Sequence, residues 1–202
     1  MRNKNSSSLM SYIIAFVIVF GGMAIFGGFN VPNAAGDNIK STYSCDVKYV
    51  SLNTSINTVD KNGNPVNISG DILKFIEDPL SMRNEAGDVI AYAGDSYNLV
   101  SQDDHGIYLN GDFVFDVVGE FSFFGDKYYL RDSNGNPIAT VDFNWSDTNG
   151  KMYDANGALI AQYVSAFAYK DYIVYVYDEN TIDENALLMV FSSYVSDKEA
   201  DS

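Results

Sequence analysis

The chain is poor in the residues that most protein chemistry uses: its 202 residues include one cysteine and one histidine. With Cys45 alone, an internal disulfide framework is excluded, and we expect a free thiol. His105 cannot build a zinc site, which needs further His or Cys ligands. A Ser-His-Asp triad stays open as an alternative, but no G-x-S-x-G turn supports it. We therefore expect a loop histidine, no catalytic residue, no metal, no cofactor and no enzyme activity.

Basic residues are also scarce. Twelve Lys and Arg stand against 27 Asp and Glu, a net charge of −15. Arg2 and Lys4 lie in the N-terminal tail and every acid lies from Asp37 onward, so the remainder carries about −17 (10 − 27). Such a field repels nucleic acids and anionic lipid headgroups at long range. We expect no nucleic-acid partner.

The acidic turns lack the signature of a calcium loop. Asp60 and Asp132 each begin a D-x-N-G-N run, but the sixth position, where an EF-hand loop requires glycine, holds Pro65 or Pro137. Asn and Asp are common in turns because they tolerate left-handed backbone and bond their own main chain. The runs therefore indicate turns.

One long apolar run is present, at the N-terminus. Residues 10–29 contain no charge, and twenty helical residues span about 30 Å, the hydrocarbon thickness of a bilayer. A cleaved signal peptide remains an alternative, but neither an A-x-A site nor a lipobox follows the run. We expect an uncleaved signal anchor at 10–29, a cytoplasmic tail at 1–9 and a linker at 30–45. This predicts a single-pass membrane protein that contacts the membrane through this helix and carries its folded domain, residues 46–202, outside the cytoplasm.

Glycines recur at an almost fixed interval through that domain. Successive spacings are 24, 24, 24 and 22 residues, and an Asn precedes four of the five glycines. Asn-Gly is the strongest short signal for a hairpin with a type I′ turn, in which both central residues have positive φ. A fixed period of turns indicates a repeated two-strand unit. The predicted turn residues are Asn62, Gly63, Gly87, Asn110, Gly111, Asn134, Gly135, Asn156 and Gly157.

The C-terminal segment has a different pattern. Thr181 and Glu184 fit a capping box, and residues 186–191 are apolar on every side, which predicts a buried helix over about 183–196. Five or six hairpins give ten to twelve strands, and a barrel that wide cannot fill its interior with strand side chains alone. We therefore predict a mainly β fold: an antiparallel closed barrel of repeated hairpins, about 12-stranded, around this apolar helix. The residues expected at the centre are Leu187, Leu188, Val190 and Phe191.

The segment Tyr108–Ala139 resembles the LURP-one-related proteins, which belong with the tubby C-terminal and phospholipid-scramblase-like folds. The resemblance lies in the D-x-N-G turn and in the connection that precedes it. It implies a twelve-stranded barrel around a C-terminal helix, extending over residues 46–195. The matching positions are Asp132, Asn134 and Gly135 in the turn, and Gly119, Phe121, Phe123, Gly125, Asp126 and Lys127 in the connection.

These observations predict a membrane-anchored, non-enzymatic binding or scaffolding module. Its partner would be a protein or a lipid-associated complex. The family resemblance implies a lipid-associated role of scramblase or tubby type as an alternative. A secreted or surface hairpin-repeat binding protein is a further alternative.

Overall fold

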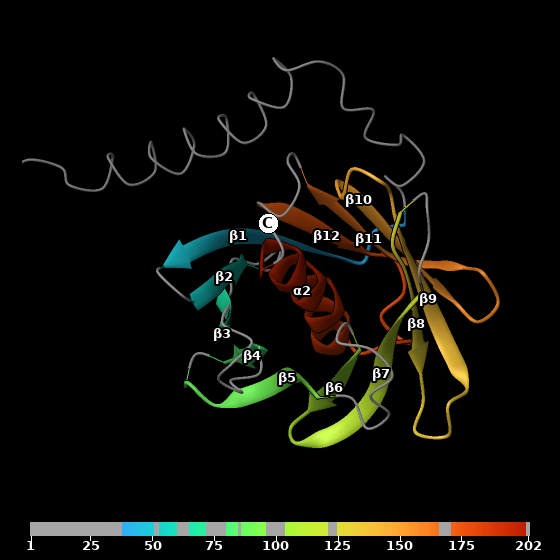
Figure 1. The fold of residues 1–202 in the computed structure, drawn as a ribbon, viewed down its shortest axis with the longest axis horizontal. Coiled ribbons are helices and arrows are strands. Elements are labelled where there is room, and N and C mark those ends of the chain that lie inside the picture. The colour runs from blue at the N-terminus through green and yellow to red at the C-terminus, as the bar shows by residue number, and fades with distance from the viewer. Residues whose placement is uncertain are drawn as a thin grey trace, which may run out of the picture. The chain divides into compact units, whose positions relative to one another are not determined.

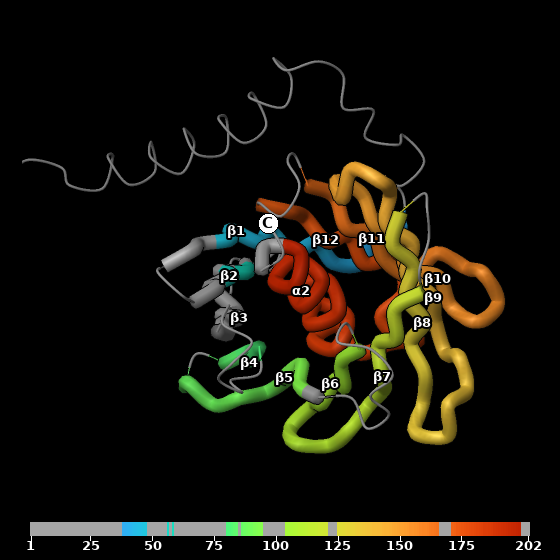
Figure 2. Tube along the Cα trace, viewed as in Figure 1, coloured from blue at the N-terminus to red at the C-terminus, as the bar shows by residue number. Residues whose placement is uncertain are grey.

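Twelve antiparallel strands and one helix, α2, make up the described part of the chain (Figure 1). The computed structural model describes residues 38–50, 53–59, 65–71, 80–84, 86–95, 104–120, 125–165 and 171–200. Figure 2 shows the hairpins following one another in chain order around α2. The elements are β1 Ser41–Val50, β2 Asn53–Val59, β3 Pro65–Asp71, β4 Leu80–Arg83, β5 Val89–Asp95, β6 His105–Leu109, β7 Asp112–Glu120, β8 Lys127–Arg131, β9 Pro137–Phe143, β10 Asn149–Asp154, β11 Leu159–Ser165, β12 Tyr172–Val176 and α2 Glu184–Ala200.

The prediction of a closed barrel of about 12 strands needs correction. Ten strands, β4 to β12 and then β1, form one antiparallel sheet that is not closed by itself, because β1 and β4 do not pair with each other. The backbone ladders of β2 and β3 lie between those two strands, and with them the pairing order runs from β1 through β12 down to β2. The β3–β4 ladder has only three residue pairs, and residues 72–79, which lie outside the described ranges, separate the two strands in the chain. This is the shortest ladder among the described strands.

The membrane prediction is also corrected. Within the described ranges, no helix is both long enough and apolar enough to cross a bilayer. A single-pass membrane protein with a signal anchor is therefore not supported. Residues 10–29, where that helix was expected, lie outside the described residues, as does the first half of the predicted linker, residues 30–37. β1 begins at Ser41, inside the range expected to be linker, because its first residues pair with the end of β12.

The Asn-Gly turns between β8 and β9 and between β10 and β11 differ from the predicted type I′ geometry. At the β8–β9 turn only Gly135 has positive φ (80°), and its N–H donates to the carbonyl of Asp132. The Asp132 carboxylate accepts hydrogen bonds from the backbone N–H groups of Asn134 and Asn136, at 2.9 and 2.8 Å. This is a three-residue loop with a left-handed glycine at its end. Hydrogen bonds from Asn136 are the main reason why the pKa of Asp132 is lowered.

Two further turns repeat this geometry. In the loop that ends at Gly157 (φ 82°), the Asp154 carboxylate accepts from the backbone N–H groups of Asn156 and Ala158. In the loop that ends at Gly87 (φ 89°), the side-chain oxygen of Asn84 accepts from the N–H of Asp88. The β6–β7 turn alone among the described turns has positive φ at both central residues, Asn110 (50°) and Gly111 (90°). The predicted pair Asn62–Gly63 lies outside the described residues.

Helix α2 provides the centre of the core. All ten residues from Ala186 to Val195 are buried, including the four expected at the centre, and none of these four is more than 2% exposed. The helix lies closest along β4, β5 and β6. Phe191 packs against the rings of Phe143 and Tyr163, with centroids 6.1 and 5.9 Å apart. A helix that is apolar all round is stable in water only when it is enclosed in this way.

The predicted capping box is wrong. Asp183 is the residue before α2, and its carboxylate accepts from the N–H of Asn185 at 2.8 Å. Thr181 instead donates to Asp178 at 2.5 Å, and Tyr43 of β1 donates to the Glu184 carboxylate. An Asp N-cap satisfies the same unpaired N–H groups as a Thr would.

Replacing Gly135 with Val should destabilise the domain by about 1–3 kcal/mol, because a β-branched residue resists positive φ. No atom lies within 4 Å of a Cβ at this position, so the effect isolates backbone strain. Urea unfolding measures it. Gly135→Asn is the control, since Asn tolerates left-handed backbone and should change stability far less. Equal losses in both variants would refute the assignment.

Truncating the helix core should have a larger effect. Phe191→Ala removes a fully buried ring and should lower the free energy of unfolding by about 3–5 kcal/mol. Val89, which is 39% exposed, supplies the control: Val89→Ala should change stability by less than about 0.5 kcal/mol. A Phe191→Ala variant as stable as the wild type would show that α2 is peripheral.

Candidate functional site

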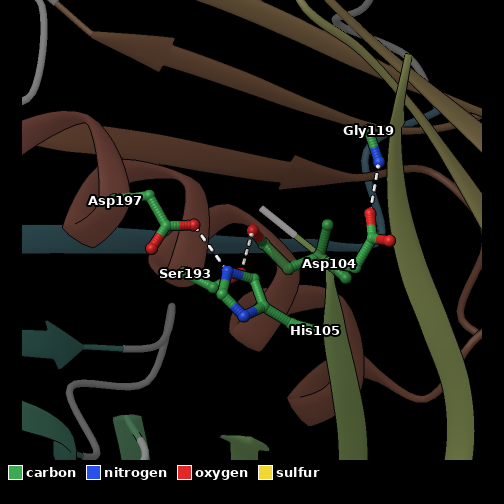
Figure 3. Close-up of polar contacts among 6 residues, drawn as sticks. Asp104, His105, Gly119, Ser193 and Asp197 are labelled. Carbon is green, nitrogen blue, oxygen red and sulfur yellow. Dashed lines mark hydrogen bonds and ion pairs between the residues drawn. The ribbon is translucent and has the colours of Figure 1, made fainter. Parts of the chain in front are cut away.

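His105 faces the last turns of α2. Its Nε2 lies 2.6 Å from the Asp197 carboxylate, and both side chains are about a quarter exposed (22% and 27%). The neighbouring Asp104 points away and accepts from the N–H of Gly119 at 3.2 Å (Figure 3). The sequence placed His105 in a loop beside two acids, but it begins β6 and its acidic partner is 92 residues further along the chain.

Ser193 lies near this pair and completes a set of residues that superficially matches a catalytic triad. Its hydroxyl, however, donates to the carbonyl of Val190 at 3.0 Å, one turn back in the helix (Figure 3). The cavity lined by Ser193, His105 and Asp197 has a volume of about 10 Å³, room for about one water molecule. A nucleophile must instead bond its base and face a substrate. This geometry therefore does not support a hydrolase.

A second set of polar side chains links the end of α2 to the segment before β8 and to the loop between β9 and β10. We call Asp126, Asp147, Tyr194 and Lys198 the terminal cluster. The Tyr194 hydroxyl donates to Asp147, and Lys198 forms an ion pair with Asp126. Burial raises the pKa of Tyr194, and its hydrogen bond to Asp147 raises it further. The phenol therefore stays neutral and acts as a donor.

Phe143, at the end of β9, is the apolar neighbour of the terminal cluster. Its ring stacks on Tyr194 with centroids 3.5 Å apart and planes 9° from parallel. Two glycines make room for this residue: a Cβ at Gly125 would lie 2.2 Å from the Phe143 carbonyl oxygen, and one at Gly150 would lie 2.5 Å from its ring. The N–H of Phe143 also donates to the Asp126 carbonyl at 2.8 Å. The residue that precedes the β9–β10 loop is therefore fixed by both its ring and its backbone.

That loop, Asn144–Thr148, is closed by the side chain of its first residue; we call it the tryptophan loop. The side-chain oxygen of Asn144, Oδ1, accepts from the N–H groups of Thr148 and Asn149, each at 3.0 Å. Its amide nitrogen donates to the hydroxyls of Ser146 and Thr148 at 2.9 and 3.2 Å. Asp147 has a positive φ (54°), and its carboxylate accepts a hydrogen bond from the Tyr194 hydroxyl. Hydrogen bonds from the Asn144 side chain therefore connect the two ends of the loop.

Trp145, the only tryptophan of the chain, projects from this loop with 82% of its surface exposed. The other large hydrophobic side chain exposed among the described residues is Val89. The sequence did not lead us to predict Trp145 as a site residue. The available signal was a single Trp between two predicted strands, in a segment rich in turn-forming residues. Both amide hydrogens of Asn144 are donated within the loop, and a glycan attached to its nitrogen would disrupt them.

The remaining predicted residues lie away from this loop. The described turn residues lie at hairpin tips, and Asn134–Gly135 lies at the opposite end of β9 from Asn144. Cys45 is buried at 2% exposure beside Thr58, and burial raises the pKa of its thiol to about 12. A thiol in that state is a small buried hydrophobe, in agreement with the predicted free thiol. Within the described ranges, no group of three or more His, Cys, Asp or Glu side chains could hold a metal ion.

Comparison with known proteins is informative for the fold alone. No family model and no curated protein matches the chain. A crystal structure of a protein from Arabidopsis thaliana aligns with a TM-score of 0.53 at 14% identity, covering 79% of this chain and 91% of that one. A Vibrio parahaemolyticus structure, described as an outer membrane lipoprotein-sorting protein domain, covers 79% and 90% at 10% identity. Its TM-score of 0.23 is too low to carry an argument.

Replacing Asn144 with Ala should loosen the tryptophan loop and leave the core intact. The variant loses four side-chain hydrogen bonds, and we expect a destabilisation of about 1–3 kcal/mol. The single tryptophan reports directly on the loop: its time-resolved fluorescence anisotropy should decay faster than in the wild type. Asn134→Ala, at the opposite end of β9, is the matched control and should leave the Trp145 signal unchanged. An unaltered decay in Asn144→Ala would show that other contacts order the loop.

Proposed function

We propose that this domain is a non-catalytic binding module that docks a partner through the tryptophan loop. The observation that supports the proposal is the 82% exposure of Trp145 on a loop that is internally hydrogen-bonded. Burying an exposed indole in an interface is favourable, because it removes apolar surface from water. Trp is also the residue type most enriched among those that dominate binding energy. Because the loop is already ordered, little conformational entropy would be lost on docking.

The packing of the interior favours an external binding surface. Helix α2 fills the space inside the strands, and the cavity beside His105 accommodates about one water. A ligand the size of an acyl chain would therefore have to displace helix side chains that are completely buried. The membership in the LURP-one-related proteins implied by the sequence remains part of this proposal. The likeness to the Arabidopsis structure concerns the fold alone and does not identify a family.

The proposal is tested by site-specific photo-crosslinking in cells of the source organism. The photoreactive residue p-benzoylphenylalanine is placed at position 145, where it keeps an aromatic side chain on the loop. We expect an adduct of defined mass with one partner, identified by mass spectrometry. Excess unlabelled wild-type protein should compete for this adduct, and Trp145→Ala protein should compete at least about tenfold less well.

The control places the same photoreactive residue at Val89, which is also exposed but belongs to β5. We expect no adduct of the same mass from that position. Identical adducts from positions 145 and 89, or equal competition by the wild-type and Trp145→Ala proteins, would contradict a binding role for the loop.

A further inference from the structure

His105 is the single histidine of the chain, and the proposed docking loop does not include it. Its Nε2 lies 2.6 Å from the Asp197 carboxylate, so the pair connects the start of β6 to the last turns of α2 (Figure 3). Histidine is the side chain whose charge ordinarily changes between about pH 5 and 8. The contact is therefore an ion pair when the imidazole is protonated and a weaker hydrogen bond from a neutral donor when it is not.

The surroundings of His105 favour its protonated form. Asp197 supplies an opposite charge at hydrogen-bond distance, and the C-terminal end of a helix carries partial negative charge. The net charge of −15 acts in the same direction. Burial opposes it, but the desolvation is partial because the side chain of His105 remains 22% exposed. We therefore expect the imidazole to keep its proton to a higher pH in the folded chain than in the unfolded one.

The elements packed against His105 place no competing charge in the cavity beside it. Apart from His105 and Asp197, the titratable side chains that line this cavity are Tyr128 of β8 and Tyr194 of α2, and phenols ordinarily carry no charge near pH 7. The other lining residues carry no charge; they are Val117, Phe143, Val190 and Ser193.

The charged residues around the cavity also leave Asp197 as the partner of the imidazole. Asp104 precedes His105, but its carboxylate points away and accepts from the N–H of Gly119 (Figure 3). On β5, Asp95 stands opposite His105 in the strand register, so the adjacent strand contributes a further acidic residue. Lys198 is next to Asp197 in α2, and its ammonium group is paired with Asp126.

The pair lies where α2 needs support from outside the helix. The last four carbonyl groups of a helix have no partner within it, so a helix end depends on other contacts. Asp197 lies between two members of the terminal cluster, Tyr194 and Lys198, which contact Asp147 and Asp126. The contact with His105 therefore joins these two in fixing the last turns of α2, and among the three it alone includes a group that titrates near neutral pH.

We propose that His105 and Asp197 form a pH-sensitive contact, which holds the C-terminal turns of α2 against β6 more strongly when His105 is protonated than when it is neutral. The added stability is fully present below the ordinary imidazole pKa of about 6.5, and it is lost as the pH rises through the higher value of the folded state. The inference does not depend on the partner of the tryptophan loop, because it concerns a contact within the domain.

A titration of the full chain followed by NMR tests the first step, because one residue supplies all the imidazole signals. We expect the titration midpoint of His105 to be about one pH unit higher in the wild type than in Asp197→Asn. Asp142→Asn is the control. It removes the same charge from a half-exposed carboxylate near Lys127, and it should leave the midpoint almost unchanged.

Urea unfolding tests the effect on stability. His105→Gln keeps a neutral side-chain donor but cannot gain a proton. Between about pH 5.5 and about pH 8.5, the ratio of the unfolding constants of the variant and the wild type should fall about tenfold, with the wild type relatively more stable at the lower pH. This comparison cancels the acidic groups that both proteins share. In the wild type alone, amide exchange of residues 196–200, corrected for its intrinsic pH dependence, should become faster relative to residues 186–190 as the pH rises.

Three results would overturn the inference. A wild-type midpoint no higher than that of Asp197→Asn would show that this carboxylate does not stabilise the charged imidazole, and this measurement decides the matter even if His105→Gln fails to fold. An unfolding ratio that is the same at both pH values would show that the contact adds no pH-dependent stability. A changed ratio with unchanged relative exchange of residues 196–200 would show that the pair does not act on the end of the helix.

Discussion

The enclosure of α2 by the strands is the constraint on which the rest of the structure depends. A helix with ten consecutive buried residues has no polar face to present to water, so it folds only inside a surrounding wall. The wall in turn needs the helix, because strands arranged so widely cannot fill their interior with their own side chains. The stacked rings of Phe143 in β9 and Tyr194 in α2 are one contact through which the strands and the helix stabilise each other.

That stack explains how one loop can be rigid at the edge of the core. Phe143 is the last residue of β9, and the tryptophan loop begins at the next position. Tyr194 packs against the ring of Phe143 and donates a hydrogen bond to Asp147. One helix residue therefore contacts both the residue before the loop and a residue within it. The order of the loop therefore comes from the core, while Trp145 itself contributes nothing to core packing.

The same packing limits where a ligand could bind. A filled interior leaves little room for a ligand, and the polar side chains around His105 bond to α2 and its neighbours in a way that fixes the helix end. Under the proposed function, the domain would present the exposed indole of Trp145 to its partner.

The sequence by itself determined the hairpin repeat, the identity of the buried helix and the acidic character, because each follows from local spacing or composition. It predicted where Gly135 would be needed, but the three-residue loop depended on bonds from the Asp132 carboxylate to backbone groups. Only the tertiary structure decided that His105 meets Asp197 and that Phe143 meets Tyr194. Those partners are distant in the chain and come together through strand order and helix placement, which no local pattern encodes.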